Sequence, residues 1–465
     1  MSAPVLWIGV PLVIGVVALL FSSERAAARA GGVTCLILAG IALTVPVDEA
    51  LLLGPFSLKI ASSAFLFGRS LVLPASDGPL LVMIFGLCSL WFFGAEAAGV
   101  ARRLVPIGMV ILGLLIASLA VRPFLYAAML IELAALAAAP LLAPQGKAPG
   151  RAAIRFLIYQ TLGMPCILLA GWLLAGVETS PGDLALTIQA TVMLSLGFAF
   201  LLAVFPLNDW IPGLMQESHP YVPGFLVWLL PNIILVFGLS FLDGYAWLRA
   251  SPEIIGGLRT VGLLMLVSSG ALSALERNLG RMMGHAAIAE TGFILIATSL
   301  ATVSGADTIF PFFIPRGIGL VLWALALGVI HRSDAKMDLT SLRDIGHTHP
   351  WAGAGLVLAS LSTAGLPLLA GFPPRIDVWD GLADVSGSAA LWYLIGLTGL
   401  MIGAARQLAL LVGARSEEPN VPQETGLQRV MLGTGMLALV LMGVFPRAVA
   451  FLVDKLPLMF EHLVR

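Results

Sequence analysis

The sequence has 465 residues, of which 59% are hydrophobic and 11% are charged, and its formal net charge is −1. Soluble domains carry about 25% charged residues, so this composition excludes an ordinary soluble protein and is typical of a chain whose apolar surface is covered by membrane lipid. The sequence has no basic run that could neutralise phosphates, which argues against nucleic acid as a partner.

Fourteen apolar runs divide the chain, with centres near residues 13, 38, 88, 112, 132, 165, 196, 232, 265, 292, 320, 360, 400 and 440. Each is close to the roughly 20 residues that a helix needs to cross a bilayer. No Lys or Arg precedes the run that begins at Val5, so we expect a retained helix and not a signal peptide. The predicted fold class is all-α, a polytopic membrane protein with about 14 transmembrane helices.

Residues 47–77 form the one sizeable connection between these runs. Apolar and polar residues alternate in part of this stretch, which is typical of strands. The stretch therefore predicts either a hairpin or a short helix outside the membrane.

The distribution of Lys and Arg predicts the orientation. With 14 spans, the odd-numbered connections hold 14 of the 25 basic residues, and the opposite face, termini included, holds 8. Because cytoplasmic loops are richer in Lys and Arg, we expect a cell (inner) membrane protein with both termini on the outer, periplasmic side.

Prolines and polar residues interrupt two of the runs. One interruption, at residues 205–212, contains Pro206 and Pro212, and the other, at residues 364–375, contains Pro367, Pro373 and Pro374. Freed carbonyls at membrane depth are tolerated only inside protein or beside water. Since the predicted spans 7 and 12 are five helices apart, they run in opposite directions, which favours two inverted halves around an ion or substrate pathway. Ordinary proline kinks are the alternative.

Four segments in order resemble one family, the antiporter-like membrane subunits of respiratory complex I (NADH-quinone oxidoreductase), energy-converting hydrogenases and multisubunit cation/proton antiporters. Residues 205–212 are similar to its proline–leucine–histidine–x–tryptophan–leucine–proline signature, and residues 279–293 to its leucine–lysine–arginine-to-glycine–tyrosine block. Residues 342–375 resemble the stretch ending in glycine–phenylalanine–x–x–lysine, and residues 130–133 the fifth-helix block with a single glutamate.

This resemblance implies two inverted five-helix repeats with discontinuous helices 7 and 12. It divides the chain into an N-terminal three-helix segment at residues 1–100, repeats at 101–245 and 250–415, and a last helix at 425–465. It also implies transport of protons or cations within a larger complex, together with other antiporter-like subunits and subunits of a quinone or hydrogenase module. Redox chemistry would lie in those partners, so no cofactor, metal or catalytic site is expected in this chain.

The sequence departs from the family in its lysines. The resemblance implies buried lysines on several helices, but the four lysines here lie outside the apolar runs. Leu201 and Leu320 stand at two expected lysine positions, and Arg375 stands at the second interruption. Arginine stays protonated under nearly all conditions, so it is a poor proton carrier.

The remaining candidates for an ion pathway are buried charges. A glutamate within a membrane span is a functional candidate by default. The candidates are Glu132, Glu290, Arg316, Arg375 and Asp377. For Glu132 a neutral packing role is the alternative, and Asp377 and Asp380 could instead pair with Arg375 as a structural contact.

Four further residues are candidates for a cytoplasmic mouth: Asp209, Glu217, His219 and His285. A solvated loop is the alternative for the first three, and a capping or loop role is expected for His285.

Three functions follow. The first is an ion-translocating, redox-driven or antiporter-complex subunit with its lysine axis largely lost. The second is a structural paralogue that scaffolds such a complex without pumping, and the third is a stand-alone secondary transporter.

Overall fold

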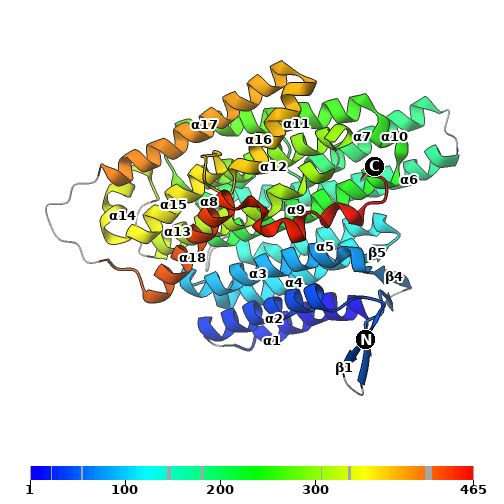
Figure 1. Cartoon of the computed structure of the whole chain (residues 1–465), viewed down its shortest axis with the longest axis horizontal. Helices are drawn as coiled ribbons and strands as arrows, with labels where there is room; N and C mark the ends of the chain where they lie inside the picture. Colours follow the sequence, from blue (N-terminus) through cyan, green and yellow to red (C-terminus); the bar gives the residue numbers. More distant parts are fainter. Residues whose placement is uncertain are drawn as a thin grey trace. The chain divides into compact units, whose positions relative to one another are not determined.

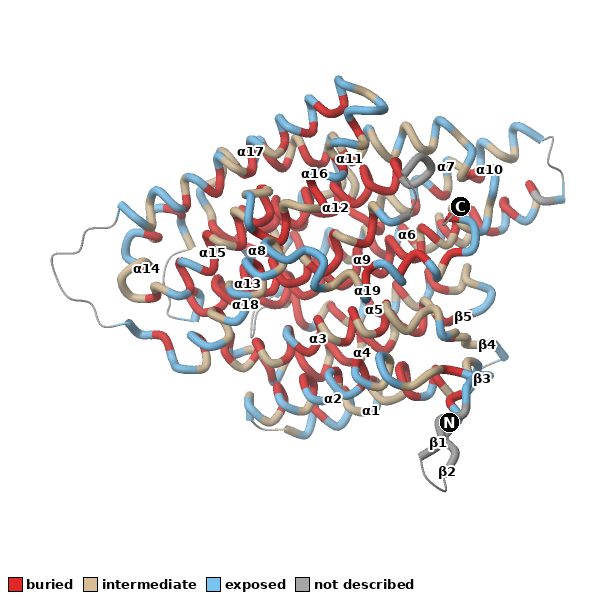
Figure 2. Tube along the Cα trace, in the orientation of Figure 1, coloured by how far each residue is buried: buried red, intermediate tan, exposed pale blue. Residues whose placement is uncertain are grey.

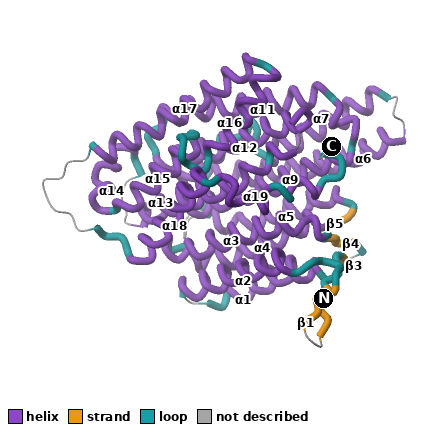
Figure 3. Tube along the Cα trace, viewed as in Figure 1, coloured by secondary structure: helices purple, strands orange, loops and turns teal. Residues whose placement is uncertain are grey.

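The structure, a computed structural model, describes residues 2–21, 23–53, 56–66, 68–143, 148–179, 183–304, 306–332, 337–413 and 422–463. These residues are mainly helical (Figure 3). Twelve of the described helices are long and apolar enough to cross a membrane. Their bounds are Glu24–Thr44, Ala75–Ala98, Ala101–Ala120, Phe124–Leu142, Arg151–Val177, Leu184–Leu201, Tyr221–Gly244, Pro252–Leu275, Leu279–Leu300, Phe310–Arg332, Gly387–Val412 and Gly426–Val444. The chain is a multi-pass membrane protein.

The other two predicted spans lie on shorter helices. One is the apolar helix Val5–Ala18, and the other is divided between α15 (Pro350–Thr363) and α16 (Phe372–Val385). Each predicted apolar run therefore falls on helix, and the count of long spans differs from fourteen because these two runs contain short or interrupted helices.

The chain divides into two compact units. Unit 1 consists of Met1–Ser89, Arg102–Trp210 and Leu229–Ser240. Its elements are η1 (Val5–Gly9), α1 (Val10–Ala18), α2 (Glu24–Thr44), β1 (Ala50–Leu53), β2 (Phe56–Lys59), β3 (Ser63–Leu66), β4 (Arg69–Val72), η2 (Ala75–Asp77), most of α3 (Gly78–Ala98), α4 (Ala101–Ala120), β5 (Val121–Arg122), η3 (Phe124–Tyr126), α5 (Ala127–Leu142), α6 (Arg151–Thr179) and α7 (Leu184–Leu201). In this unit α6 packs against both α5 and α7, and α1 packs against α2 (Figure 1).

Unit 2 consists of Leu90–Ala101, Ile211–Trp228 and Phe241–Arg465. Its elements are α8 (Trp210–Glu217), parts of α9 (Tyr221–Gly244), α10 (Ala246–Ala250), α11 (Pro252–Leu275), α12 (Leu279–Ser304), η4 (Ala306–Thr308), η5 (Phe310–Phe312), α13 (Phe313–Arg332), η6 (Leu339–Ser341), α14 (Leu342–Thr348), α15, α16, α17 (Gly387–Val412), α18 (Gly426–Val444), η7 (Pro446–Val449), α19 (Ala450–Val453) and η8 (Leu456–Met459).

Residues 47–77 contain strands. β1 pairs with β2 and β3 pairs with β4, both antiparallel, with Ala50 opposite Lys59 and Ser63 opposite Val72. β5 adds to the β4 edge. Of the two alternatives for this stretch, the hairpin is confirmed at both strand pairs, and a short helix, the 3₁₀ helix η2 (Ala75–Asp77), is present at its end.

Two helices form the buried centre of unit 2. The apolar window of α12 is wholly buried and that of α13 is 94% buried, and both appear mainly red in Figure 2. Glycines permit close packing around them. Gly292 on α12 lies against Gly262 on α11. A Cβ on Gly270 of α11 would overlap the backbone of Gly396 on α17, and a Cβ on Gly399 of α17 would overlap the backbone of Gly270. Small residues of this kind allow membrane helices to approach closely.

Both interruptions are breaks in helix. α7 ends at Leu201 and α8 begins at Trp210, while α15 ends at Thr363 and α16 begins at Phe372. Each break contains a non-glycine residue with a left-handed backbone, Ala203 at φ 52° and Leu368 at φ 72°. Such backbone is sparsely populated and persists only where the surroundings impose it.

The prolines divide between the breaks and the helices that follow. Pro206 and Pro367 lie in the breaks, whereas Pro212 lies in the first turn of α8, and Pro373 and Pro374 lie in the first turn of α16. The first turn tolerates proline because its N–H groups have no intrahelical acceptor. The breaks therefore occupy residues 202–209 and 364–371, and the first lies three residues earlier than the sequence predicted.

Candidate functional site

A buried ion pair joins α12 to α16. The Glu290 Oε1 and Arg375 Nη2 atoms are 2.5 Å apart, and the two side chains are 5% and 3% exposed. The alternative that Asp377 or Asp380 pairs with Arg375 is wrong, because both are exposed and Glu290 takes the guanidinium. Successive helical positions are rotated by about 100°, so a residue two positions along points to nearly the opposite side.

The second break holds Arg375 in place. Its Nη1 donates to the Gly371 carbonyl at 2.5 Å, the Gly371 N–H donates to Ser362 Oγ at 3.2 Å, and the Tyr393 hydroxyl donates to the Arg375 carbonyl at 3.0 Å. These bonds satisfy backbone groups that the broken helix leaves free, as burial requires. Gly365, at φ +81°, is a position where glycine is needed, and a Cβ there would meet the Arg375 side chain at 3.0 Å.

Aromatic rings form the rest of the surroundings of Arg375. The centre of its guanidinium lies 4.4 Å from the Phe293 ring centroid and 5.9 Å from that of Phe312. Phe293 also packs edge-on against Tyr393, with 5.5 Å between centroids. A cation over an aromatic face in a desolvated site is stabilised by about 2 kcal/mol, so the charge is held by an acid on one side and by rings on another.

A second buried arginine uses the neighbouring residue of α12. Arg316, on α13 and 2% exposed, donates from Nη2 to Thr291 Oγ1 at 3.0 Å and to the Val227 carbonyl at 3.1 Å. Its Nε and Nη1 have no hydrogen-bond partner among the described residues. Since the α12 residues that hold Arg375 and Arg316 are neighbours in the chain, the two guanidinium groups and the Glu290 carboxylate form one site, with a formal charge of +1.

The residues that α12 presents to the two arginines determine which group of the site can exchange a proton. Adjacent residues, Glu290 and Thr291, hold two arginines that come from α16 and α13. The arginines keep their protons at all ordinary pH values, so within the site only the glutamate can exchange one. Buried donors without protein partners are normally satisfied by water or an ion.

The profile of the NADH:quinone oxidoreductase/Mrp antiporter transmembrane family matches residues 127–403. The chain belongs to this family. The matched region covers both breaks and all five pathway candidates.

Relatives include NADH-quinone oxidoreductase subunit N of Cereibacter sphaeroides, 27% identical over 378 residues, which covers 80% of this chain and 78% of that protein. Subunit N of Rhodococcus opacus is 24% identical over 293 residues, 60% of this chain. The alignments span 52% of the Rhodococcus protein and 46% of the one from Cutibacterium acnes, about half the length of each.

Solved structures share the fold over nearly the whole chain. A chain of respiratory complex I from Thermus thermophilus with bound NADH aligns with a TM-score of 0.78 at 21% identity, covering 99% of this chain and 100% of that one. A chain of the archaeal membrane-bound sulfane sulfur reductase gives 0.82 at 16% identity, covering 100% and 98%. A chain of the Mrp complex from Dietzia gives 0.74 at 15% identity, covering 99% and 97%.

Glu132 lies in unit 1, and it has fewer polar neighbours than Glu290. It is on α5, partly buried, and no described residue hydrogen-bonds to or pairs with its carboxylate. In the same unit, exposed Asp209 forms an ion pair with Arg155 of α6. Unit 1 therefore offers an acid without a buried basic partner, whereas unit 2 contains a complete charge cluster.

The remaining predicted mouth residues lie in unit 2. Glu217 ends α8 and is exposed, and His219 follows in the connection to α9, with its ring centroid 4.9 Å from that of His331. Burial, with smaller contributions from the neighbouring His331 and Arg332, lowers the pKa of His219 to about 4. His219 is thus neutral near pH 7 and is not a proton acceptor there.

The expected loop or capping role of His285 is wrong. The ring is 4% exposed in the second turn of α12, and its Nε2 lies 3.9 Å from a Glu276 carboxylate oxygen. Sequence reasoning missed the contact between Glu276 and His285. The one signal in the sequence was the i, i+4 spacing of Arg281 and His285, which places both side chains on one face of the helix. Sequence reasoning also missed Thr291 and Tyr393, for which the sequence gives no signal beyond their type.

Proposed function

We propose that this chain is an antiporter-like membrane subunit that translocates protons, or another cation, within a redox-driven or multisubunit antiporter complex. The observation that carries the proposal is the buried site of Glu290, Arg375, Arg316 and Thr291 beside the second helix break. A buried ion pair is not retained for stability alone, because apolar replacements are often as stable. A charge cluster inside a membrane span is better explained by ion movement.

The geometry restricts how a proton could pass. While the guanidinium occupies Oε1 at 2.5 Å, Glu290 can accept a proton on its other carboxylate oxygen, Oε2, and the neutral acid then holds Arg375 less strongly. Protonation thus leaves Arg375 without an anionic partner, held by Gly371 and the Phe293 ring. Opening and closing of this pair would be the step that moves charge, and the unpartnered donors of Arg316 support water in its path.

Flux measurements on the native complex in liposomes test this function. Glu290→Gln is expected to reduce coupled proton movement, and Glu132→Gln tests the acid of unit 1. Asp380→Asn is the matched control, because it removes an exposed acid on α16 that is not a pathway candidate. Unchanged proton movement in both glutamate variants would contradict translocation by this chain.

A structural, non-pumping role is the second candidate, and one specific observation favours it. Arg375 and the apolar Leu201 and Leu320 stand where the resemblance implies lysines, so the basic groups of the site cannot release protons. This role predicts that Glu290→Gln changes assembly or stability of the complex but not its proton-to-substrate ratio. A stand-alone secondary transporter is tested by purification, since that role requires transport by the isolated chain.

The setting of the chain is part of the proposal. Its partners would be other membrane subunits, as the relatives are named subunits of NADH-quinone oxidoreductase and the similar chains come from multisubunit assemblies. We place it in the cell (inner) membrane with fourteen spans in two inverted repeats and both termini outside, α15 and α16 together forming the twelfth span. Cysteine labelling from each side of sealed vesicles, at Ser2 and at the α11–α12 connection, tests this orientation.

A further inference from the structure

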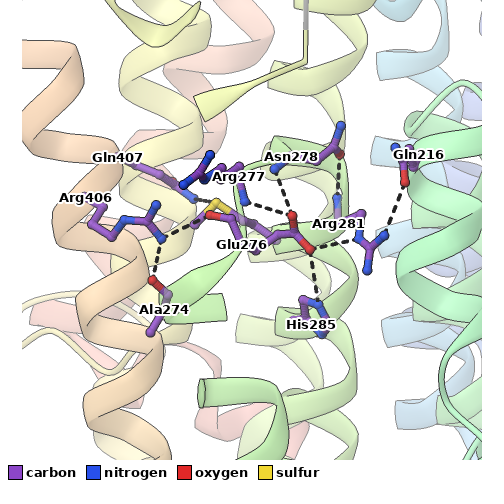
Figure 4. Close-up of polar contacts among 10 residues, drawn as sticks. Gln216, Ala274, Glu276, Arg277, Asn278, Arg281, His285, Arg406 and Gln407 are labelled. Atoms are coloured by element: carbon purple, nitrogen blue, oxygen red, sulfur yellow. Dashed lines mark hydrogen bonds and ion pairs between the residues drawn. The ribbon is translucent and has the colours of Figure 1, made fainter. Parts of the chain in front are cut away.

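A second polar cluster lies at the start of α12, away from the Glu290 site. Figure 4 shows Glu276, Arg281 and His285, which we call the Glu276 cluster. The Glu276 Oε1 accepts the backbone N–H groups of Arg277 at 2.8 Å and Asn278 at 3.1 Å. Its Oε2 lies 2.8 Å from Arg281 Nε and 3.9 Å from His285 Nε2. Two basic groups therefore face one carboxylate oxygen.

The His285 ring is buried without hydrogen bonds. Neither ring nitrogen has a partner among the described residues, although the residue is only 4% exposed. Burial of a polar group without a partner is costly. A separation of 3.9 Å is too long for a hydrogen bond, but a small movement would bring a protonated Nε2 onto the carboxylate.

The charges around the ring come from few elements. Glu276 and Arg281 act electrostatically on it. From α17, Arg406 donates to the Ala274 and Glu276 carbonyls and not to the carboxylate. From α8 the nearby side chain is Gln216, which is uncharged. Glu276 is thus the one acid acting on His285 in the described part of the chain.

Arg281 also has a second hydrogen-bond acceptor nearby, on α8. Its Nη1 lies 3.5 Å from Gln216 Oε1, which is at the outer limit of a hydrogen bond (Figure 4). If His285 took the shared Glu276 oxygen, Arg281 could strengthen its contact with α8. The cluster would then have a second arrangement, which differs from the observed one by one proton.

α8 packs closely against α12, so a change in the contacts of Arg281 would affect the position of α8. A Cβ at Gly284 would meet the Pro212 backbone at 2.6 Å, and one at Gly280 would meet the Met215 carbonyl at 2.5 Å. α8 follows the first helix break, and α12 carries Glu290. A shift of Arg281 between Glu276 and Gln216 acts directly at the contact of these two helices.

We propose that His285 is a proton-binding site with Glu276 as its counter-ion, at which the proton displaces Arg281 from Glu276 and strengthens its contact with Gln216 on α8. The bond formed is Nε2–H, the bond broken is an O–H bond of hydronium in the aqueous phase, and the site gains one positive charge. The role of this site in transport rests on the proposed function, whereas proton binding itself does not. In transport it would link proton uptake to the contact between α8 and the helix that carries Glu290.

Proton binding can be measured directly on the full-length chain in lipid nanodiscs. The chain has six histidines, so the His285 signal in a ¹³C,¹⁵N-histidine NMR spectrum is assigned by its loss in His285→Gln. This signal is expected to change as the pH is lowered and the ring takes up a proton. Glu276→Gln should weaken proton binding by about tenfold or more, because an opposite charge this close shifts a titration by one unit or more.

Two further variants, which should change the proton affinity of His285 in opposite directions, keep the inference testable if one variant folds poorly. Arg281→Gln removes the competing cation and should strengthen proton binding at His285, while Gln216→Leu removes the alternative acceptor and should weaken it by a few fold. The pair of exposed His462 and partly buried Asp243, 3.7 Å apart, is the control. Asp243→Asn should change the His462 signal by less than Glu276→Gln changes the His285 signal, since solvent screens the charge on an exposed ring.

Two results would overturn the inference: a His285 signal that does not titrate, or shifts of the same sign in Glu276→Gln and Arg281→Gln. An unchanged midpoint in Gln216→Leu would overturn the link to α8. Proton flux separates this inference from the proposed function. If His285 titrates while Glu290→Gln and Glu132→Gln have normal flux, the proton-binding site is retained and translocation by this chain is rejected. If His285 does not titrate while those variants have reduced flux, the site is rejected and translocation is retained.

Discussion

Replacement of Glu290 by glutamine is the most informative perturbation of the buried site. Glutamine keeps the shape and can still accept a hydrogen bond from Arg375, so the change removes charge and little else. The formal charge of the site rises from +1 to +2 when the carboxylate is lost. Breaking a buried pair by removal of one partner costs about 3–5 kcal/mol. We expect about 3 kcal/mol, because the Gly371 carbonyl and the Phe293 ring still hold the guanidinium.

A double-mutant cycle isolates the pair. Arg375→Met leaves Glu290 buried without its basic partner, whereas the double variant Glu290→Gln, Arg375→Met removes both charges. The loss in free energy of unfolding is measured by chemical denaturation of the purified chain in micelles. For the double variant this loss should be below the sum of the two single losses by at least about 1 kcal/mol. Asp377→Asn should stay within about 0.5 kcal/mol of wild type. Additive single costs, or a Glu290→Gln variant as stable as wild type, would refute the reasoning.

Three further outcomes follow. Because the folded-state pKa of His219 is about 4, below its usual value, the unfolded chain binds more protons at pH 4 to 6.5. Stability should thus fall by about 2 kcal/mol between pH 8 and pH 5, and His219→Gln should remove that part of the acid sensitivity measured by denaturation. Thr291→Val should cost about 1–3 kcal/mol of unfolding free energy by orphaning an Arg316 donor, whereas Thr291→Ser should restore most of it. Gly371→Ala should cost about 1–3 kcal/mol in the same assay, because the new Cβ would overlap the Ser362 carbonyl.

The positions of the helices could be predicted because the bilayer imposes one length on every span. Each apolar run coincides with helix, and prolines marked both interrupted segments. The extent of the first break could not be predicted closely, since Pro212 is compatible with a first helical turn and gives no boundary by itself.

The partners of buried charges could not be predicted from sequence. Asp377 is close to Arg375 in the chain but points away, and Glu290, 85 positions distant, makes the contact. Only the packing of α16 on α12 brings these two side chains together. The burial of His285 was also hidden, because a helix that is buried all round has no polar face to show which residues point inward.

The two arginines bear on which cation the proposed function would carry. A metal cation reaching Glu290 would stand near both Arg375 and Arg316, and two like charges 4 Å apart repel by about 4 kcal/mol at an effective dielectric constant of 20. A proton gives the site the same formal charge of +2 as a monovalent metal cation would, but it binds covalently to one carboxylate oxygen and needs no further oxygen ligands beside the guanidiniums. The site therefore favours protons over sodium or potassium. If replacement of external sodium by a large organic cation stopped transport in the native complex at constant pH, this argument would fail.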